Sequence, residues 1–117
     1  MEFEVEFYES TLGRSPVQEF LDDLKKTDPD DFAAVLAGLA KLRNRQYHRP
    51  PLSKPLCDEL FEMRHVGKLN TRVLYLFARG RRIILVHGIR TKALKIAAHD
   101  LRVAIGRKRD WIARNRE

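Results

Sequence analysis

Residues 60–88 read LFEMRHVGKLNTRVLYLFARGRRIILVHG. This segment holds three short runs that are rich in β-branched, aromatic and aliphatic residues. The runs are residues 60–65, 71–78 and 82–87. They are separated by residues 66–70 and 79–81, whose lengths suit antiparallel hairpins. The segment therefore predicts three consecutive antiparallel strands, with Gly88 at the end of the last one.

The alternation within these runs predicts which side chains face the core. Phe61 and Met63 point to the predicted core face of the first strand. Glu62 and Arg64 lie two residues apart and so point together to the opposite face. Tyr75 shares the parity of the apolar residues two positions before and after it, which predicts a core position for it as well.

The residues before this segment predict a strand and two helices. Residues 2–7 alternate glutamate with Phe or Val, which predicts a half-buried strand with an acidic outer face. The sequence SPVQ at residues 15–18 predicts a helix start, with a serine cap, a proline at the first helical position and a glutamine placed to bond back to the cap. Asp28 and Pro29 begin a second helix in the same way, and it should end after Arg43.

The remaining residues complete the predicted architecture. Three prolines within residues 48–55 exclude a helix there and predict a linker. After residues 90–92 the apolar spacing becomes helical. The resulting order is β-α-α-β-β-β-α, an α+β fold with an antiparallel sheet packed against helices. The length of 117 residues predicts one domain over residues 1–117.

Composition excludes several classes of protein. Hydrophobic residues make up 44% of the chain and charged residues 33%, which is typical of a folded rather than a disordered chain. The longest apolar run, residues 32–40, is far shorter than the roughly 20 residues that span a bilayer, and residues 1–6 do not resemble a secretory signal. The single cysteine, Cys57, can form no internal disulfide. We therefore expect a reducing, cytoplasmic location and no membrane association.

The net charge of +7 is unevenly distributed along the chain. Residues 1–40 carry three basic and ten acidic residues, a balance of −7. The remaining 20 basic and 6 acidic residues give residues 41–117 a balance of +14. Such a basic segment is typical of a polyanion-binding protein, although a solvated basic surface has the same composition.

Basic residues near the predicted strand ends are the main candidates for chemistry. If the strands are neighbours, five of them converge on one sheet face or rim. These are Arg64, Arg72, Arg90, Lys92 and Lys95. Such a cluster can position a phosphodiester and stabilise a pentavalent transition state without a metal, and a 2′-hydroxyl nucleophile would restrict cleavage to RNA. The alternative is a solvated basic face that performs no chemistry.

Three further residues have two interpretations each. His87 is a candidate general acid or base, or it supports packing or a hydrogen bond at a strand end. Glu62 orients Arg64 through a paired charge, or it is a solvated strand residue. Trp111 stacks on a nucleic-acid base, or it anchors the last helix. The four histidines lack the spacing of metal ligands and no common phosphate-loop or dinucleotide motif is present, so we expect no metal and no cofactor.

Four motifs together resemble the HigB-like branch of the RelE/ParE toxin superfamily. They are KPL at residues 54–56, LFEMR at 60–64, TRVLY at 71–75 and ILVHGI at 84–89. That branch has a K-P-L, an L-x-E-L-R-like strand, an R-V-L-Y strand and a strand ending in L-L-H-G-F, followed by lysines and an amphipathic helix. The resemblance covers residues 54 to about 111, and the N-terminal strand and helices agree in order.

The resemblance implies a small RelE-like toxin of a bacterial or phage toxin–antitoxin pair, usually an endoribonuclease that cuts mRNA in the ribosomal decoding site. Arg72 matches the family's strand arginine implicated in phosphate binding, and Arg64 lies in its basic strand. Lys92 and Lys95 lie where several relatives keep an active-site Lys or Arg, although Thr91 interrupts the usual pair of lysines. The implied partner is a small antitoxin protein, often of the helix-turn-helix type.

We therefore predict a metal-independent, ribosome-dependent mRNA endoribonuclease that inhibits translation and binds the ribosome, mRNA and a cognate antitoxin. The predicted catalytic residues are Arg72, Lys92, Lys95 and His87. The predicted RNA-binding residues are Arg64, Arg90 and Glu62. Two alternatives stay open: a ParE-like inhibitor of DNA gyrase without nuclease activity, and a non-catalytic nucleic-acid-binding module.

Overall fold

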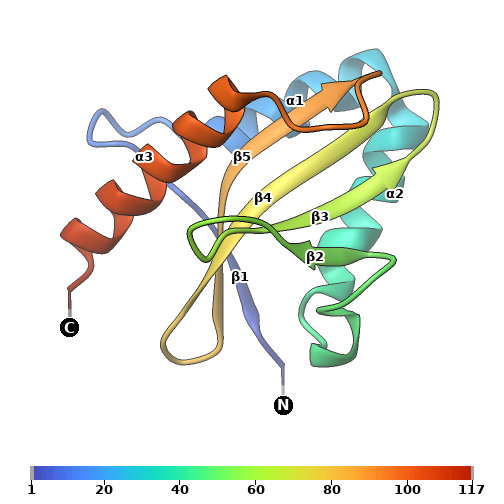
Figure 1. Cartoon of the computed structure of the whole chain (residues 1–117). Coiled ribbons are helices and arrows are strands. Elements are labelled where there is room, and N and C mark those ends of the chain that lie inside the picture. The colour runs from blue at the N-terminus through green and yellow to red at the C-terminus, as the bar shows by residue number, and fades with distance from the viewer. Residues whose placement is uncertain (1, 117) are drawn as a thin grey trace.

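The computed structural model describes residues 2–116 and consists of a sheet with helices packed against it (Figure 1). The strands are β1 (Glu4–Phe7), β2 (Ser53–Pro55), β3 (Phe61–Val66), β4 (Asn70–Ala78) and β5 (Arg82–Thr91). The helices are α1 (Pro16–Thr27), α2 (Pro29–Lys41) and α3 (Ala98–Arg114), with a short 3-10 helix, η1, at Arg45–Tyr47. The predicted α+β class is confirmed. Within residues 2–116, no helix is long and apolar enough to cross a membrane.

The five strands form one sheet in the order β1-β5-β4-β3-β2. Neighbouring strands from β2 to β5 are antiparallel, which confirms the prediction for the last three. Two features differ from the prediction: β1 pairs with β5 in parallel, and residues 53–55 of the expected linker form the edge strand β2. Pro55 is compatible with that position, because an edge strand does not need every backbone N–H for pairing.

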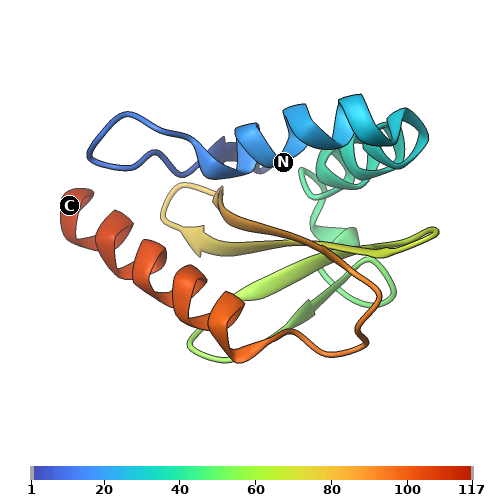
Figure 2. The same ribbon diagram turned by 90° about the horizontal axis from the view of Figure 1, so that it is seen from above.

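The helices cover opposite faces of the sheet (Figure 2). The hairpin of α1 and α2 packs on one face, where Leu21, Val35 and Met63 belong to the first hydrophobic core. α3 packs on the other face, where Ala104 and Leu74 belong to the second core. The acidic N-terminal hairpin and the basic last helix are therefore held on opposite sides of the sheet.

The predicted alternation of core side chains is largely confirmed. Met63 and Tyr75 are fully buried in the first core, and Phe61 packs against it. Trp111 packs against the second core, with the Arg82 guanidinium 5.2 Å from its ring centroid, so it anchors α3 as one of its two interpretations predicts. Phe7 differs from the prediction, because it ends the edge strand β1 and is 39% exposed.

The predicted helix starts are at the right positions, but only one cap forms as expected. Ser15 is the N-cap residue of α1, yet its side chain makes no capping hydrogen bond. Gln18 donates to Asp22 rather than back to the cap. At α2, Asp28 Oδ1 accepts a hydrogen bond from the backbone N–H of Asp31 at 3.1 Å, as the sequence predicts.

β5 continues to Thr91, so the prediction that it ends at Gly88 is wrong. Gly88 is instead a position of close packing between β5 and α1. A Cβ atom placed on Gly88 would lie 2.5 Å from ring atoms of Phe20, a distance that real contacts do not reach. Glycine is required there because the Phe20 ring lies directly against the strand backbone.

Gly88→Ala should lower the free energy of unfolding by about 1–3 kcal/mol, because the added methyl group clashes with Phe20. Gly106→Ala is a matched control, since Gly106 lies within α3 and nothing lies within 4 Å of a Cβ placed there. The control should raise stability by about 0.5–1 kcal/mol. Urea denaturation checks both variants, and equal effects would contradict the close packing at Gly88.

Candidate nucleic-acid interface

A buried ion pair lies on the α3 face of the sheet. The side chains of Glu62 in β3 and Arg72 in β4 are 1% and 2% exposed, and Arg72 Nε lies 3.1 Å from Glu62 Oε2. The remaining guanidinium nitrogens of Arg72 donate to the backbone oxygens of Ala93 at 3.4 Å and Leu94 at 2.5 Å. Arg72 therefore joins β3 and β4 to the loop between β5 and α3.

Two lysines adjoin this ion pair. Lys54 of β2 is the cross-strand neighbour of Glu62, and its Nζ lies 3.5 Å from Glu62 Oε1. Lys95, in the loop before α3, lines a cavity of about 300 Å³ together with Lys54, Glu62 and Arg72. The rest of the wall consists of Leu56, Cys57, Leu94, Ile96 and Leu101. Charges in such a partly apolar cavity interact more strongly than charges in bulk water.

Arg64 adds a further positive charge to the same face. It is the direct cross-strand partner of Arg72, so two like charges stand side by side, which destabilises a strand pair unless an anion is close. Arg64 Nε is buried and has no hydrogen-bond partner among residues 2–116. We call these four residues the cationic cluster: Lys54, Arg64, Arg72 and Lys95. Among the described residues, Glu62 is the only carboxylate that forms an ion pair with a member of the cationic cluster, so the cluster has an excess of positive charge that suits a bound anion.

Arg90 does not join the cationic cluster, so the expectation that it converges with the other basic residues is wrong. Its guanidinium donates to Asp28 Oδ2 at 2.7 Å and to Asp31 Oδ2 at 3.1 Å, on the α1–α2 face. The cause is a β-bulge in β5. Leu74 pairs with His87 and Tyr75 pairs with Leu85, so Val86 is an extra residue without a partner in β4. The bulge moves the side chains of all later residues of β5 to the face opposite the one that simple alternation predicts. The RNA-binding role of Arg90 stays a prediction.

The surroundings of Glu62 differ from both of its predicted interpretations. It is neither solvated nor paired with Arg64, because its neighbours are Lys54 directly across β2 and Arg72 diagonally across β4. Lys92 is exposed in the loop after β5, next to the backbone oxygen that Arg72 binds. Its catalytic role stays a prediction.

His87 lies on the α3 face because of the same bulge. Its Nε2 lies 2.8 Å from Asp100 Oδ1, and Arg107 donates to its Nδ1 at 2.9 Å. Since Nδ1 accepts a hydrogen bond, the proton resides on Nε2 and is donated to Asp100. Burial keeps the pKa of His87 below its usual 6.5; the bond to Asp100 opposes this and the charge of Arg107 reinforces it. Both ring nitrogens are thus occupied in fixing α3 to β5, and a role in acid–base catalysis stays a prediction.

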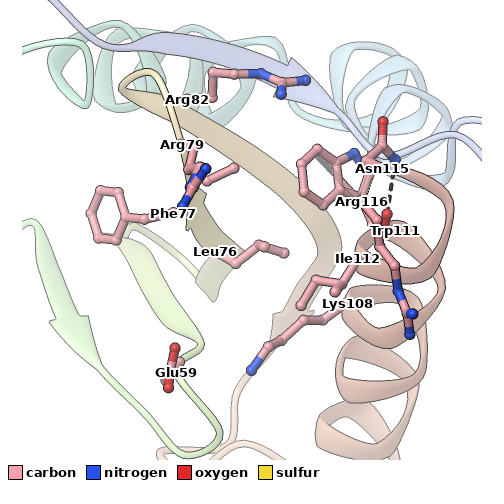
Figure 3. Close-up of a pocket in the computed structure, with 11 residues that line it drawn as sticks. Glu59, Leu76, Phe77, Arg79, Arg82, Lys108, Trp111, Ile112, Asn115 and Arg116 are labelled. Carbon is pink, nitrogen blue, oxygen red and sulfur yellow. Dashed lines mark hydrogen bonds between the residues drawn. The ribbon is translucent and has the colours of Figure 1, made fainter.

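A second cavity, of about 380 Å³, lies between the β4–β5 hairpin and the C-terminal part of α3 (Figure 3). Arg79, Lys108 and Arg116 contribute basic groups to it, and Trp111 contributes an aromatic one. None of the predicted site residues lines this cavity. It is therefore separate from the cationic cluster.

Lys54 is the residue of the cationic cluster that sequence reasoning missed. Its signal was the KPL motif at residues 54–56, which carried the family resemblance without a role for the lysine. Among the described residues, no group of three or more His, Cys, Asp or Glu side chains is placed to hold a metal ion.

The α+β fold, with a five-stranded sheet packed against helices, is compatible with a small RelE-like domain. The model of the family described as phage derived protein Gp49-like matches residues 19–109. The chain belongs to this family, which is a toxin family of toxin–antitoxin systems. No curated protein matches the chain. The predicted relationship to the superfamily is thus confirmed, and the HigB-like branch stays a prediction.

Glu62→Ala should lower the free energy of unfolding by about 3–5 kcal/mol, because it leaves Arg72 buried without its counter-charge. Lys54→Ala removes the exposed partner of the same carboxylate and should cost less than about 1 kcal/mol. Urea denaturation measures both. Comparable losses in the two variants would contradict the assignment of Arg72 as the main partner of Glu62.

Acid should destabilise the protein through His87. Because its folded pKa is depressed, the unfolded chain takes up that proton first, so stability is complete above pH 6.5 and falls as the pH drops below it. His87→Gln should therefore show a smaller decrease in Tm between pH 7 and about pH 5 than the wild type. An unchanged slope in His87→Gln would refute this role.

Proposed function

We propose that this protein is the toxin of a toxin–antitoxin pair and cleaves ribosome-bound mRNA without a metal ion. Membership of the Gp49-like family supports the toxin role. The observation that carries the nuclease role is the charge balance of the cationic cluster: Glu62 pairs with Lys54 and Arg72, and no carboxylate among the described residues pairs with Arg64 or Lys95. A phosphodiester at the mouth of this cavity would supply the missing negative charge.

In the proposed reaction, the RNA's own 2′-hydroxyl attacks the adjacent phosphorus and the bond from phosphorus to the 5′ oxygen breaks. The products are a 2′,3′-cyclic phosphate and a 5′-hydroxyl. Lys54 and Lys95 contact the phosphate oxygens, because both are exposed at the cavity. Arg72 is held below them and contributes a fixed positive field to the transition state, which gains negative charge.

Proton transfer in this scheme takes place beside solvent. The proton of the 2′-hydroxyl passes to water, and Lys95 protonates the leaving 5′ oxygen. His87 does not act as the base in this scheme, because its two ring nitrogens are hydrogen-bonded to Asp100 and Arg107. The partner antitoxin would inhibit the reaction by covering the cationic cluster, and rRNA phosphates would strengthen association with the ribosome.

Lys95→Ala should reduce mRNA cleavage about a hundredfold, which is the usual effect of removing one group that stabilises transition-state charge. Lys54→Ala should reduce it comparably. Lys26→Ala is the control, because Lys26 is exposed in the last turn of α1 on the other face of the sheet. The variants are induced in growing bacteria and mRNA 5′ ends are mapped.

Growth arrest with intact transcripts would contradict this proposal. A supercoiling assay then separates the alternatives. Inhibition of DNA gyrase would identify a ParE-like activity, whereas nucleic-acid binding without cleavage or gyrase inhibition would identify a binding module.

A further inference from the structure

A cavity of about 760 Å³ curves around the open edge of the sheet. Its lining residues come from the end of α2, from η1, from the proline-rich loop, and from β2 and β3. Lys54 and Glu62 line both this cavity and the cavity of the cationic cluster, so the two adjoin at β2. We call the 760 Å³ cavity the edge groove.

The edge groove combines cations with one aromatic side chain and several apolar ones. The cations are Lys41, Arg49, Lys54 and Arg64, the aromatic residue is Tyr47, and the apolar residues are Pro50, Pro51, Leu52 and Val66. Arg49 is exposed, and its side chain has no hydrogen-bond or ion-pair partner within residues 2–116. Lys41 Nζ lies 5.6 Å from the centroid of the half-buried Tyr47 ring. Arg64 contributes the buried Nε that lacks an acceptor. Of the described residues, Glu62 is the only one that contributes a carboxylate to the lining, and it already pairs with Lys54 and Arg72.

These groups match the two parts of a nucleotide. Arg64 is half-buried and has no hydrogen-bond or ion-pair partner for its side chain among the described residues, so a phosphate in the groove would supply the missing counter-charge. Arg49 offers a second phosphate contact at the rim of the groove. Tyr47 offers a ring face for a base, the kind of contact that single-strand-binding proteins combine with a basic groove.

We propose that the edge groove binds the nucleotides next to the scissile phosphate of a single-stranded RNA. The flanking phosphates contact Arg64 and Arg49, and a base stacks on Tyr47. This inference rests on the proposed nuclease function, because the strand runs from the cationic cluster across Lys54 into the groove. It gives roles to Tyr47 and Arg49, which lie outside the motifs that carry the family resemblance.

A protein segment is less well suited to the same groove. A peptide that adds to the sheet needs a row of free backbone groups on the edge strand. β2 has three residues, ends in Pro55 and follows residues 50–51, which are both proline. The N–H of Arg64 on β3 already donates to the backbone oxygen of Leu52 at 2.8 Å. The edge therefore offers side-chain cations rather than backbone donors.

The test uses the full chain and fluorescein-labelled single-stranded DNA oligomers, which lack the 2′-hydroxyl and are not cleaved. Fluorescence anisotropy gives the affinity of a trimer and of an octamer over a range of salt concentrations. Arg49→Ala should weaken octamer binding about threefold to tenfold and reduce the slope of log K against log salt by about 1. The trimer affinity should change little, because the trimer is held by the cationic cluster.

Two pairs of variants provide matched controls. Arg79→Ala removes the same charge from an exposed position on the β4–β5 hairpin and should leave octamer affinity within about twofold of the wild type. Tyr47→Ala should weaken octamer binding about tenfold, whereas Tyr47→Phe keeps the ring and should bind like the wild type. The pair at Tyr47 separates loss of stacking from loss of a hydroxyl group.

Equal losses in Arg49→Ala and Arg79→Ala would mean that overall charge drives binding and would overturn the inference. Unchanged octamer affinity in Arg49→Ala and Tyr47→Ala would also overturn it. If those two variants instead weaken binding of the antitoxin, the groove is a protein-docking surface. Cleavage of ribosome-bound mRNA is measured separately, so the two proposals can fail independently. Cleavage without a groove effect refutes only the edge groove, and groove-dependent binding without cleavage refutes only the nuclease.

Discussion

The buried carboxylate of Glu62 determines how the α3 face of the sheet is arranged. A carboxylate out of contact with water is tolerated only when it is paired, and here Arg72 and Lys54 pair with it from the strands on either side. Because Arg72 also binds backbone oxygens of the loop after β5, the same interaction fixes the loop that carries Lys95. Strand pairing, loop position and local charge balance all depend on this one group.

The basic residues on the two faces of the sheet differ in their carboxylate partners. On the α1–α2 face, Arg90 meets the carboxylates of Asp28 and Asp31, which neutralise it and fasten the helical hairpin to β5. On the α3 face, Glu62 pairs with Lys54 and Arg72, and no carboxylate of the described residues pairs with Arg64 or Lys95. The number of carboxylates that pair with the basic residues, rather than the number of basic residues, therefore distinguishes a structural ion-pair network from a surface suited to a polyanion.

The class and order of the elements could be predicted because they follow from local periodicity. Met63 and Tyr75 were predictable core residues, since the side-chain period of a strand is fixed by its backbone geometry. The face of Arg90 was not predictable, because one extra residue in the bulge at Val86 reverses the parity of the rest of β5. The pairing of Glu62 also depends on strand register, which no single segment of sequence specifies. Likewise, Lys54 lies in a proline-rich segment that has the pattern of a linker.

The cationic cluster has unpaired positive charge, whereas Arg90 on the α1–α2 face is paired with two carboxylates. Arg64 Nε and Arg90 Nε are both buried without a hydrogen-bond partner in the described part of the chain, but only Arg90 faces two carboxylates. The most direct measurement is NMR of the arginine Nε–H signals during titration with a single-stranded dinucleotide. We expect a saturable shift of the Arg64 signal, with the Arg90 signal unmoved. Equal shifts of both signals, or no shift of Arg64 at saturating dinucleotide, would contradict it.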